Sequence, residues 1–322
     1  MMQVNMVTAL NSALEMGMSE NENVVLLGED IGRDGGVFRV TDGLMGKFGE
    51  KRVIDTPLAE SGIMGTAIGM AIGGLHPVPE AQFAGFMFLG FSQLVNHAAR
   101  YRSRSRSTIQ LPMVVRTPVS GGVRTLEHHS ESPETYYAHM GGLIVVEPST
   151  PYDAKGLMIK ALRMNDPVIF LEPTKLYRLF KQEVPDEAYE VPIGKASLVR
   201  EGSALTIITY GTMVPIVKDV VAKKNIDAEI IDLRTINPLD EEAILASVKK
   251  TGRVVIAHEA SLSFGVGAEI SARIAEKAIF ELDAPIVRVG SPSMPYPFPG
   301  YERFYVPNAL KISQAIDKVM EA

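Results

Sequence analysis

The sequence predicts an α/β protein of two domains, each with a mostly parallel sheet and helices on both faces. Short apolar runs typical of strands alternate with segments of helical periodicity along almost the whole chain. A length of 322 residues is typical of two domains. Residues 179–193 are polar, lack periodicity and carry Pro185 and Pro192, as a linker would. We therefore expect domains at residues 1–178 and 194–322, joined by that linker.

The first domain should begin with a helix, because apolar residues recur at helical spacing over residues 4–20. Apolar runs bounded by glycine, proline or polar residues predict its strands at 24–27, 52–54, 78–82, 111–116, 143–147 and 168–172. Between them, helical periodicity predicts helices at 44–48, 88–102, 134–140 and 152–163, and a further helix rich in glycine after residue 60.

The second domain repeats the alternation. Strands are expected at 204–209, 228–232, 254–257 and 286–289, and helices at 214–223, 240–249, 267–280 and 310–320. The segment 292–299 is rich in proline and should be irregular, since proline lacks a backbone donor.

Composition excludes several classes of protein. The net charge of −6 argues against a nucleic-acid binder, and the absence of cysteine removes disulfides, thiolate metal sites and cysteine nucleophiles. The N-terminus lacks the pattern of a signal peptide, so we expect the cytoplasm or an equivalent soluble compartment. From Ser61 to Ala99 the only formal charge is Glu80. The prolines and glycines within this stretch favour buried elements and a large subunit interface over a membrane span.

The stretch from Ile54 to Gly65 is the most informative in the chain. A strand ends at Thr56-Pro57, and a helix with glycines every three or four residues follows. That spacing leaves one ridge of the helix poor in side chains, where another backbone could approach closely. Glu60, at the start of this helix, is either an acid placed to suit the helix dipole or a functional carboxylate.

Two other features have open interpretations. His128-His129 lies in a long polar loop and is either a surface pair or part of a proton-transfer site. Arg100, Arg102, Arg104 and Arg106 form a basic run, which we interpret as a solvated helix end, with a contact to an acidic partner surface as the alternative. The chain also lacks both common phosphate-binding glycine motifs and any clustered metal-ligand spacing.

Many short motifs together resemble one family. They are Gly28-Glu29-Asp30, Gly35-Gly36-Val37-Phe38, Asp55-Thr56-Pro57-Leu58-Ala59-Glu60, Gly74-Leu75-His76-Pro77-Val78, Glu80-Ala81-Gln82-Phe83, His129-Ser130-Glu131-Ser132, the run from Pro148 to Leu157, Leu176-Tyr177-Arg178, the run from Asp232 to Ile236, and Pro295-Tyr296-Pro297. Almost end to end, the chain resembles the β subunit of the E1 component of 2-oxo acid dehydrogenase complexes, of the pyruvate, branched-chain or acetoin type.

The resemblance implies a fold and partners. The fold would be a pyrimidine-binding thiamin-diphosphate domain followed by a transketolase-type C-terminal domain. The β subunit would pair with an α subunit, which holds the diphosphate and its Mg2+, in an α2β2 tetramer. The assembly would decarboxylate a 2-oxo acid on thiamin diphosphate and pass the acyl group to a lipoyl arm of the E2 acyltransferase. Pyruvate and branched-chain 2-oxo acids are equally open as substrates.

The resemblance also assigns residues. Glu60 matches the glutamate that hydrogen-bonds the pyrimidine N1′ and favours the imino tautomer, while Leu58, Gln82 and Phe86 match positions around the ring. His129 matches a loop histidine near the reactive carbon. Some members bind a structural K+ through backbone carbonyls, at positions that match Met113, Ala161, Met164 and Asp166.

Two alternative functions stay open at this point. The chain could be an assembly and docking subunit without chemistry of its own, or the C-terminal half of a split transketolase. The second needs sugar-phosphate contacts, and no basic cluster lies in the loops where they are expected.

Overall fold

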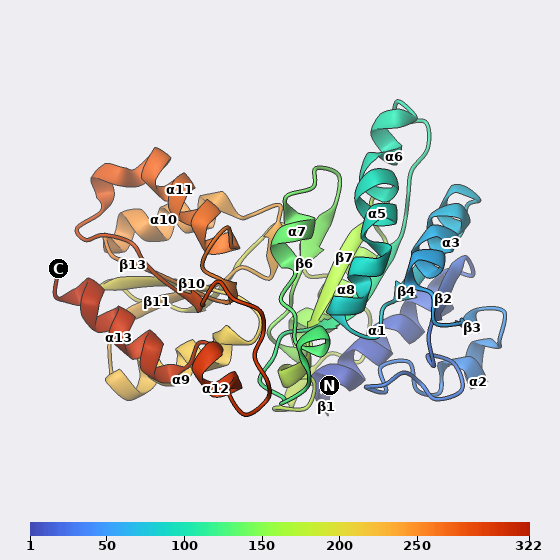
Figure 1. Cartoon of the computed structure of the whole chain (residues 1–322), viewed down its shortest axis with the longest axis horizontal. Coiled ribbons are helices and arrows are strands. Elements are labelled where there is room, and N and C mark those ends of the chain that lie inside the picture. Colours follow the sequence, from blue (N-terminus) through green and yellow to red (C-terminus); the bar gives the residue numbers. More distant parts are fainter.

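The computed structural model describes residues 1–322 and contains two α/β units that lie side by side (Figure 1). The first unit runs from blue to yellow-green, and the second from yellow to red. Each unit has its own parallel-dominated sheet, so the predicted α/β class is confirmed. The exact domain limits at residues 178 and 194 stay a prediction.

The sheet of the first unit has seven strands in the order β12-β6-β7-β5-β4-β2-β3. All pair in parallel except β12, which is antiparallel to β6. The strands are β2 (Val24–Gly28), β3 (Val53–Asp55), β4 (His76–Glu80), β5 (Val114–Val119), β6 (Ile144–Val146), β7 (Val168–Pro173) and β12 (Thr235–Asn237). The central strands β2, β4, β5 and β7 are buried along their whole length, as expected for strands covered on both faces.

Helices cover both faces of this sheet. One face carries α1 (Met6–Glu20) and α8 (Pro151–Ala161), whose apolar sides share a core with β2 and β7. The other face carries α3 (Glu60–Ile72), α7 (Glu134–Ala138) and a helical run from Ala84 to Arg104. A short helix, α2 (Leu44–Phe48), leads into β3.

The helical run was predicted as one helix over residues 88–102, and this was wrong in detail. It consists of α4 (Ala84–Met87), a 3-10 turn, α5 (Phe91–Gln93), a π-helical turn at Leu94–Ala98 and α6 (Ala99–Arg104). The apolar periodicity does not reveal such a change of pitch, because the inward residues Leu94, Val95, Ala98 and Ala99 stay buried.

The second unit has a five-stranded sheet in the order β14-β13-β10-β11-β9. Its strands are β9 (Ser197–Arg200), β10 (Leu205–Thr209), β11 (Ala228–Asp232), β13 (Val254–Ser261) and β14 (Val287–Ser291). Its helices are α9 (Met213–Lys224), α10 (Glu241–Thr251), α11 (Val266–Ala278), α12 (Glu302–Tyr305) and α13 (Ala309–Met320). Helices α9 and α13 pack on one face, whereas α10 and α11 share the larger core that continues into the first unit.

Long-range pairing explains two further differences from the predicted elements, the start of the first helix and two missed strands. The first helix begins at Met6, capped by the Asn5 side chain, because Met2–Val4 forms strand β1. Strand β1 pairs with β8 (Gln182–Val184), which lies inside the stretch 179–193 that is predicted as the linker. Strands β9 and β12 were missed, since both are short and pair with partners distant in sequence.

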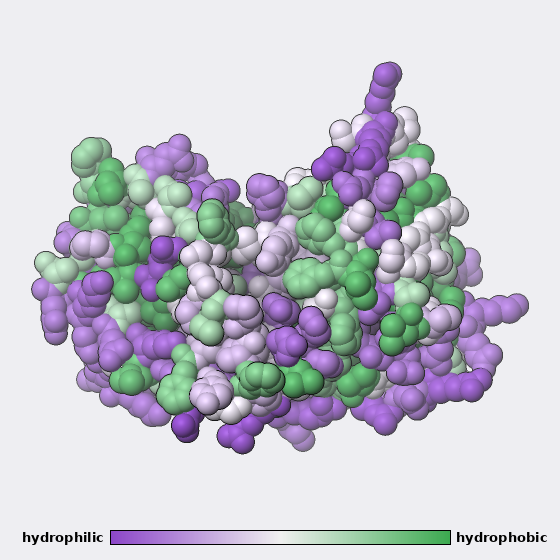
Figure 2. Space-filling view, viewed as in Figure 1, coloured by the Kyte–Doolittle hydropathy of each residue, from purple (hydrophilic) through white to green (hydrophobic).

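No helix is both long enough and apolar enough to cross a membrane. In Figure 2, pale and green residues cover much of the α3 side of the molecule, below a purple tip that holds the end of α6. On α3 the ridge of Gly62, Gly65 and Gly69 is exposed, and nothing in the chain packs on Gly69. The charge-poor surface noted in the sequence is therefore open to a partner.

The buried His258 on β13 makes the stability of the chain depend on pH. Its side chain is 0% exposed and stacks on Tyr210, and neither ring nitrogen has a hydrogen-bond partner. Burial lowers the pKa of His258 from 6.5 to about 4. The neutral ring therefore contributes stability that is complete above the unfolded pKa and is lost as the pH falls toward the folded one.

We expect His258→Phe to remove this dependence. From about pH 7.5 to about pH 5, the free energy of unfolding of the wild-type chain should fall by about 2 kcal/mol more than that of the variant. Urea unfolding followed by circular dichroism at both pH values measures this, and the difference at the higher pH gives the packing cost of the substitution. A difference that is constant with pH would contradict the prediction.

Candidate active site

The candidate residues gather at the carboxyl edge of the seven-stranded sheet. Glu29 follows β2, Glu60 lies beyond β3, Gln82 follows β4, and the loop that carries His129 follows β5. In open parallel sheets this edge is where ligands bind. The sheet therefore brings together side chains that are far apart in sequence.

Glu60 occupies the first turn of α3 and is 3% exposed. A second carboxyl, Glu29, lies close enough for the charges to interact, and its Oε1 is buried without a partner. Burial, followed by the charge of Glu60, raises the pKa of Glu29. The raised pKa favours the protonated form of Glu29, and its unpartnered Oε1 can accept a hydrogen bond from a ligand.

Gln82 lies beside this pair. Its Nε2 donates a hydrogen bond to Asp30 Oδ2 at 2.9 Å and a longer one to the Glu29 carbonyl at 3.5 Å, so the side chain is fixed on the turn that follows β2. Leu58, which was predicted to line the same pocket, is 78% exposed in the segment before α3, and nothing in the chain covers it.

Aromatic rings surround His129 at this edge of the sheet. The ring of His129 lies 5.2 Å from that of Phe86 and 4.2 Å from that of Phe83, measured between centroids, and both contacts are edge-on. His129 Nδ1 is buried without a hydrogen-bond partner, whereas His128 is exposed. A Cβ on Gly85 would come within 2.5 Å of the His128 carbonyl, so glycine at this position lets the loop approach Phe86.

A buried ion network supports the strands below this site. Arg116 on β5 donates to Glu80 Oε2 at 2.7 Å and to both oxygens of Glu172 at 2.7 and 3.0 Å, and Tyr177 also donates to Glu172. Glu80, the one charge of the stretch 61–99, is therefore neutralised inside the sheet. Removing one partner of such a network leaves a buried charge uncompensated, typically at a cost of about 3–5 kcal/mol.

The four residues suggested for K+ lie at the opposite edge of the sheet. Met113 precedes β5, and Ala161, Met164 and Asp166 surround the turn between α8 and β7. The carbonyls of Met113 and Ala161 already accept backbone hydrogen bonds from Val168 and Met164, although each carbonyl has a second lone pair. No cluster of acidic, histidine or cysteine side chains in the chain could hold a metal ion.

Two residues of the site were not singled out from the sequence. Glu29 stood in a quoted motif without a role, and its position directly after a buried strand was the available signal. Phe83 links Phe38, Phe86 and His129 through ring contacts, and no local pattern separates it from an ordinary core residue. The topology places buried carboxylates and aromatic rings at the same edge of the sheet, a combination that suits a flat heterocycle with hydrogen-bond donors.

Comparison with known families defines the class. Residues 2–179 match the family model described as the transketolase pyrimidine-binding domain, and residues 194–312 match that of the transketolase C-terminal domain. A solved split-gene transketolase, described as an inactive β4 tetramer, has the same fold, with a TM-score of 0.80 over 99% of each chain at 21% identity.

Closer relatives identify the particular family. The chain is 49% identical over 322 residues to the pyruvate dehydrogenase E1 component subunit beta of Acholeplasma laidlawii, covering 99% of this chain and 98% of that one. It is 47% identical over 324 residues to the protein of the same name from Bacillus subtilis strain 168, over the full length of both. The chain belongs to the family of pyruvate dehydrogenase E1 β subunits, which confirms the resemblance seen in its motifs.

Proposed function

We propose that this chain is the β half of an E1 enzyme that oxidatively decarboxylates a 2-oxo acid and passes the acyl group to the lipoyl group of E2. The observation that carries the proposal is the convergence of Glu60, Gln82, Phe86 and His129 at one edge of the sheet, in a chain that matches E1 β subunits end to end. Among the substrates, the names of the relatives favour pyruvate over a branched-chain 2-oxo acid.

The residues present fit the aminopyrimidine of thiamin diphosphate. The buried carboxylate of Glu60 is an acceptor for a ring N–H, and Phe86 offers an aromatic face. The orphaned Glu29 Oε1 and His129 Nδ1 show that polar groups here lack partners within the chain, as expected where a ligand supplies them. Thiamin diphosphate, when bound, supplies the carbanion chemistry that protein side chains lack.

The chain's own residues would then bind and orient. Glu60 accepts the hydrogen bond from N1′ and so sets the tautomer of the ring, while Gln82 and Leu58 border it. Phe83 and Phe86 exclude water on the side of His129. His129 is placed to hold or donate a proton during acyl transfer, because its Nδ1 is not engaged elsewhere.

An α subunit would complete the site. The exposed glycine ridge of α3 and the uncovered Leu58 suit a partner that packs against the pyrimidine side. Since the sequence has no phosphate-binding glycine motif, the diphosphate and its Mg2+ would be held by α in an α2β2 tetramer. K+ at the α8–β7 turn would have a structural role, because that turn lies at the sheet edge away from Glu60.

Reconstitution tests this division. The chain alone should show no appreciable decarboxylation of pyruvate and weak binding of thiamin diphosphate, and mixing with an α subunit should produce both. Calorimetry with the cofactor and a decarboxylation assay measure the two properties, with α alone as the control. Substantial decarboxylation by the purified chain would contradict the proposal. Full activity of the α–β assembly after substitution of Glu60 would favour a subunit that contributes assembly but no chemistry.

A further inference from the structure

The loop that carries His129 has an unusual backbone at its start. Ser120, Gly122 and Arg124 all have positive φ values, of 72°, 87° and 61°. Residues other than glycine rarely adopt this conformation, and they keep it only where surrounding contacts impose it. Something must therefore hold residues 120–124 in place.

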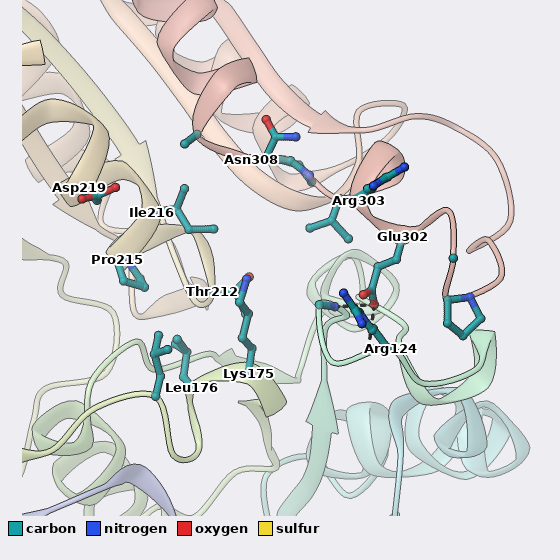
Figure 3. A pocket seen from close by; sticks show the side chains of 17 residues that line it. Arg124, Lys175, Leu176, Thr212, Pro215, Ile216, Asp219, Glu302, Arg303 and Asn308 are labelled. Carbon is teal, nitrogen blue, oxygen red and sulfur yellow. Dashed lines mark hydrogen bonds between the residues drawn. The ribbon is translucent and has the colours of Figure 1, made fainter. Parts of the chain in front are cut away.

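The contacts that hold this segment come from the second unit. Glu302, the first residue of α12, accepts hydrogen bonds through Oε1 from the backbone N–H of Gly122 at 2.8 Å and of Arg124 at 3.3 Å. The hydroxyl of Tyr296 donates to the same oxygen. Figure 3 shows Glu302 reaching down to the Arg124 segment, with these hydrogen bonds dashed.

A second carboxylate, that of Glu259, holds the neighbouring residue Gly121. Glu259 on β13 accepts the backbone N–H of Gly121 and the hydroxyl of Thr212. A side chain on Gly121 would overlap the Tyr296 ring, so the sequence Gly121-Gly122 allows the close approach. Glu302 and Glu259 are both 6% exposed, and hydrogen bonds from N–H donors to buried carboxylates are stronger than neutral ones.

We call the hydrogen bonds from this segment to Glu302 and Glu259 the clamp. Beyond residues 120–124, the hydrogen bonds of the loop are local to it. The Ser120 N–H bonds to the Glu131 carbonyl at 2.9 Å, and the hydroxyls of Thr125 and Ser130 bond at 2.8 Å. On the outer side lies a cavity of about 1040 Å3 between the two units, lined by Gly122, Arg124, Lys175 and Glu302 (Figure 3). Without the hydrogen bonds to Glu302 and Glu259, residues 122–124 would have room to move into this cavity, and His129 would keep only its ring contacts with Phe83 and Phe86.

We propose that Glu302, helped by Tyr296 and Glu259, is a positioning residue, by which the second unit fixes the loop that presents His129. The inference rests on the proposed function only in that His129 assists acyl transfer. It gives the second unit a part in the reaction, although none of its side chains belongs to the predicted site.

Proteolysis tests the clamp without any assay of activity. Arg124 is exposed, so trypsin should cut after it once the loop is released. Glu302→Ala in the full-length chain should raise the rate of this cut at least about tenfold, and Glu302→Gln, which keeps the acceptor oxygen, should restore most of the protection. Asp219→Asn is the matched control, because Asp219 lines the same cavity but pairs with Lys223 on its own helix.

The outcomes separate the clamp from the function it serves. An unchanged cut in a folded Glu302→Ala chain overturns the clamp, whatever His129 does. If circular dichroism shows that Glu302→Ala does not fold, the comparison is made with Tyr296→Phe, which removes the hydroxyl that donates to Glu302 and should raise the rate of the cut severalfold. An unchanged rate in that variant would likewise overturn the clamp.

Kinetics of the α–β assembly then test the consequence. Glu302→Ala should slow acyl transfer to lipoyl-E2 at least about tenfold and add less than about twofold in a His129→Ala background. Full additivity of the two substitutions would overturn positioning through His129. If His129→Ala alone has no effect, the role of His129 fails, and the clamp is judged on proteolysis alone.

Discussion

Glu60→Gln should slow exchange of the C2 proton of bound thiamin diphosphate by at least about tenfold, which corresponds to about 1.4 kcal/mol of barrier. Glutamine has the size of glutamate but lacks its charge, and a charge-assisted hydrogen bond is roughly twice as strong as a neutral one. Because Glu60 is buried in the first turn of α3, the isosteric change should preserve both the fold and the assembly with α.

The competing interpretation makes Glu60 a helix-terminus acid. Its interaction with the helix dipole would then contribute about 0.3–1 kcal/mol to stability and nothing to the cofactor. That interpretation predicts a slightly lower melting temperature with proton exchange untouched. Hydrogen–deuterium exchange at C2, measured in the assembled variant at full cofactor occupancy, decides between them, and an unchanged rate would remove Glu60 from the mechanism.

His129→Ala should slow reductive acylation of lipoyl-E2 by about 10²–10⁴-fold, the usual contribution of a general acid or base. Decarboxylation measured with an artificial acceptor should fall much less, because that step does not need the proton that His129 would hold. The ring also packs edge-on against Phe83 and Phe86, so the variant must first be shown to bind cofactor normally.

The neighbouring histidine provides the control. His128 is exposed and shares the loop, so His128→Ala should leave both rates nearly unchanged. Small and equal effects of His129→Ala on the two steps would make His129 an ordinary loop residue.

The sequence was most informative where local pattern and fold agree. Apolar runs located the central strands of both sheets, since strands buried on both faces are mostly apolar. Glu60, Gln82, Phe86 and His129 came from motif resemblance, and the parallel topology explains why they meet, because β3, β4 and β5 end at one edge. Their roles in the reaction stay predictions.

Features that depend on distant pairing could not be predicted. Strand β1 has only three residues, and it is a strand because β8, which lies far along the chain, pairs with it, Met2 opposite Val184. The hydrogen bonds from Gly122 and Arg124 to Glu302 could not be predicted for the same reason, since no local sequence pattern indicates that these distant segments are in contact. The contacts of Leu58 could not be predicted from this sequence either, because in the proposed assembly the residues around it belong to another chain.

The antiparallel pairing of β12 with β6 has a consequence for how the chain can be divided. Thr235–Asn237 comes from the second half of the sequence yet forms the border strand of the first unit's sheet. An amino-terminal fragment ending at the linker would expose the backbone of β6 as a bare sheet edge, and such edges recruit other chains. The same cut would divide the core of 34 buried residues that both units share. The two family domains are thus not independent folding units, because the intact polypeptide is needed to complete the first sheet and the shared core.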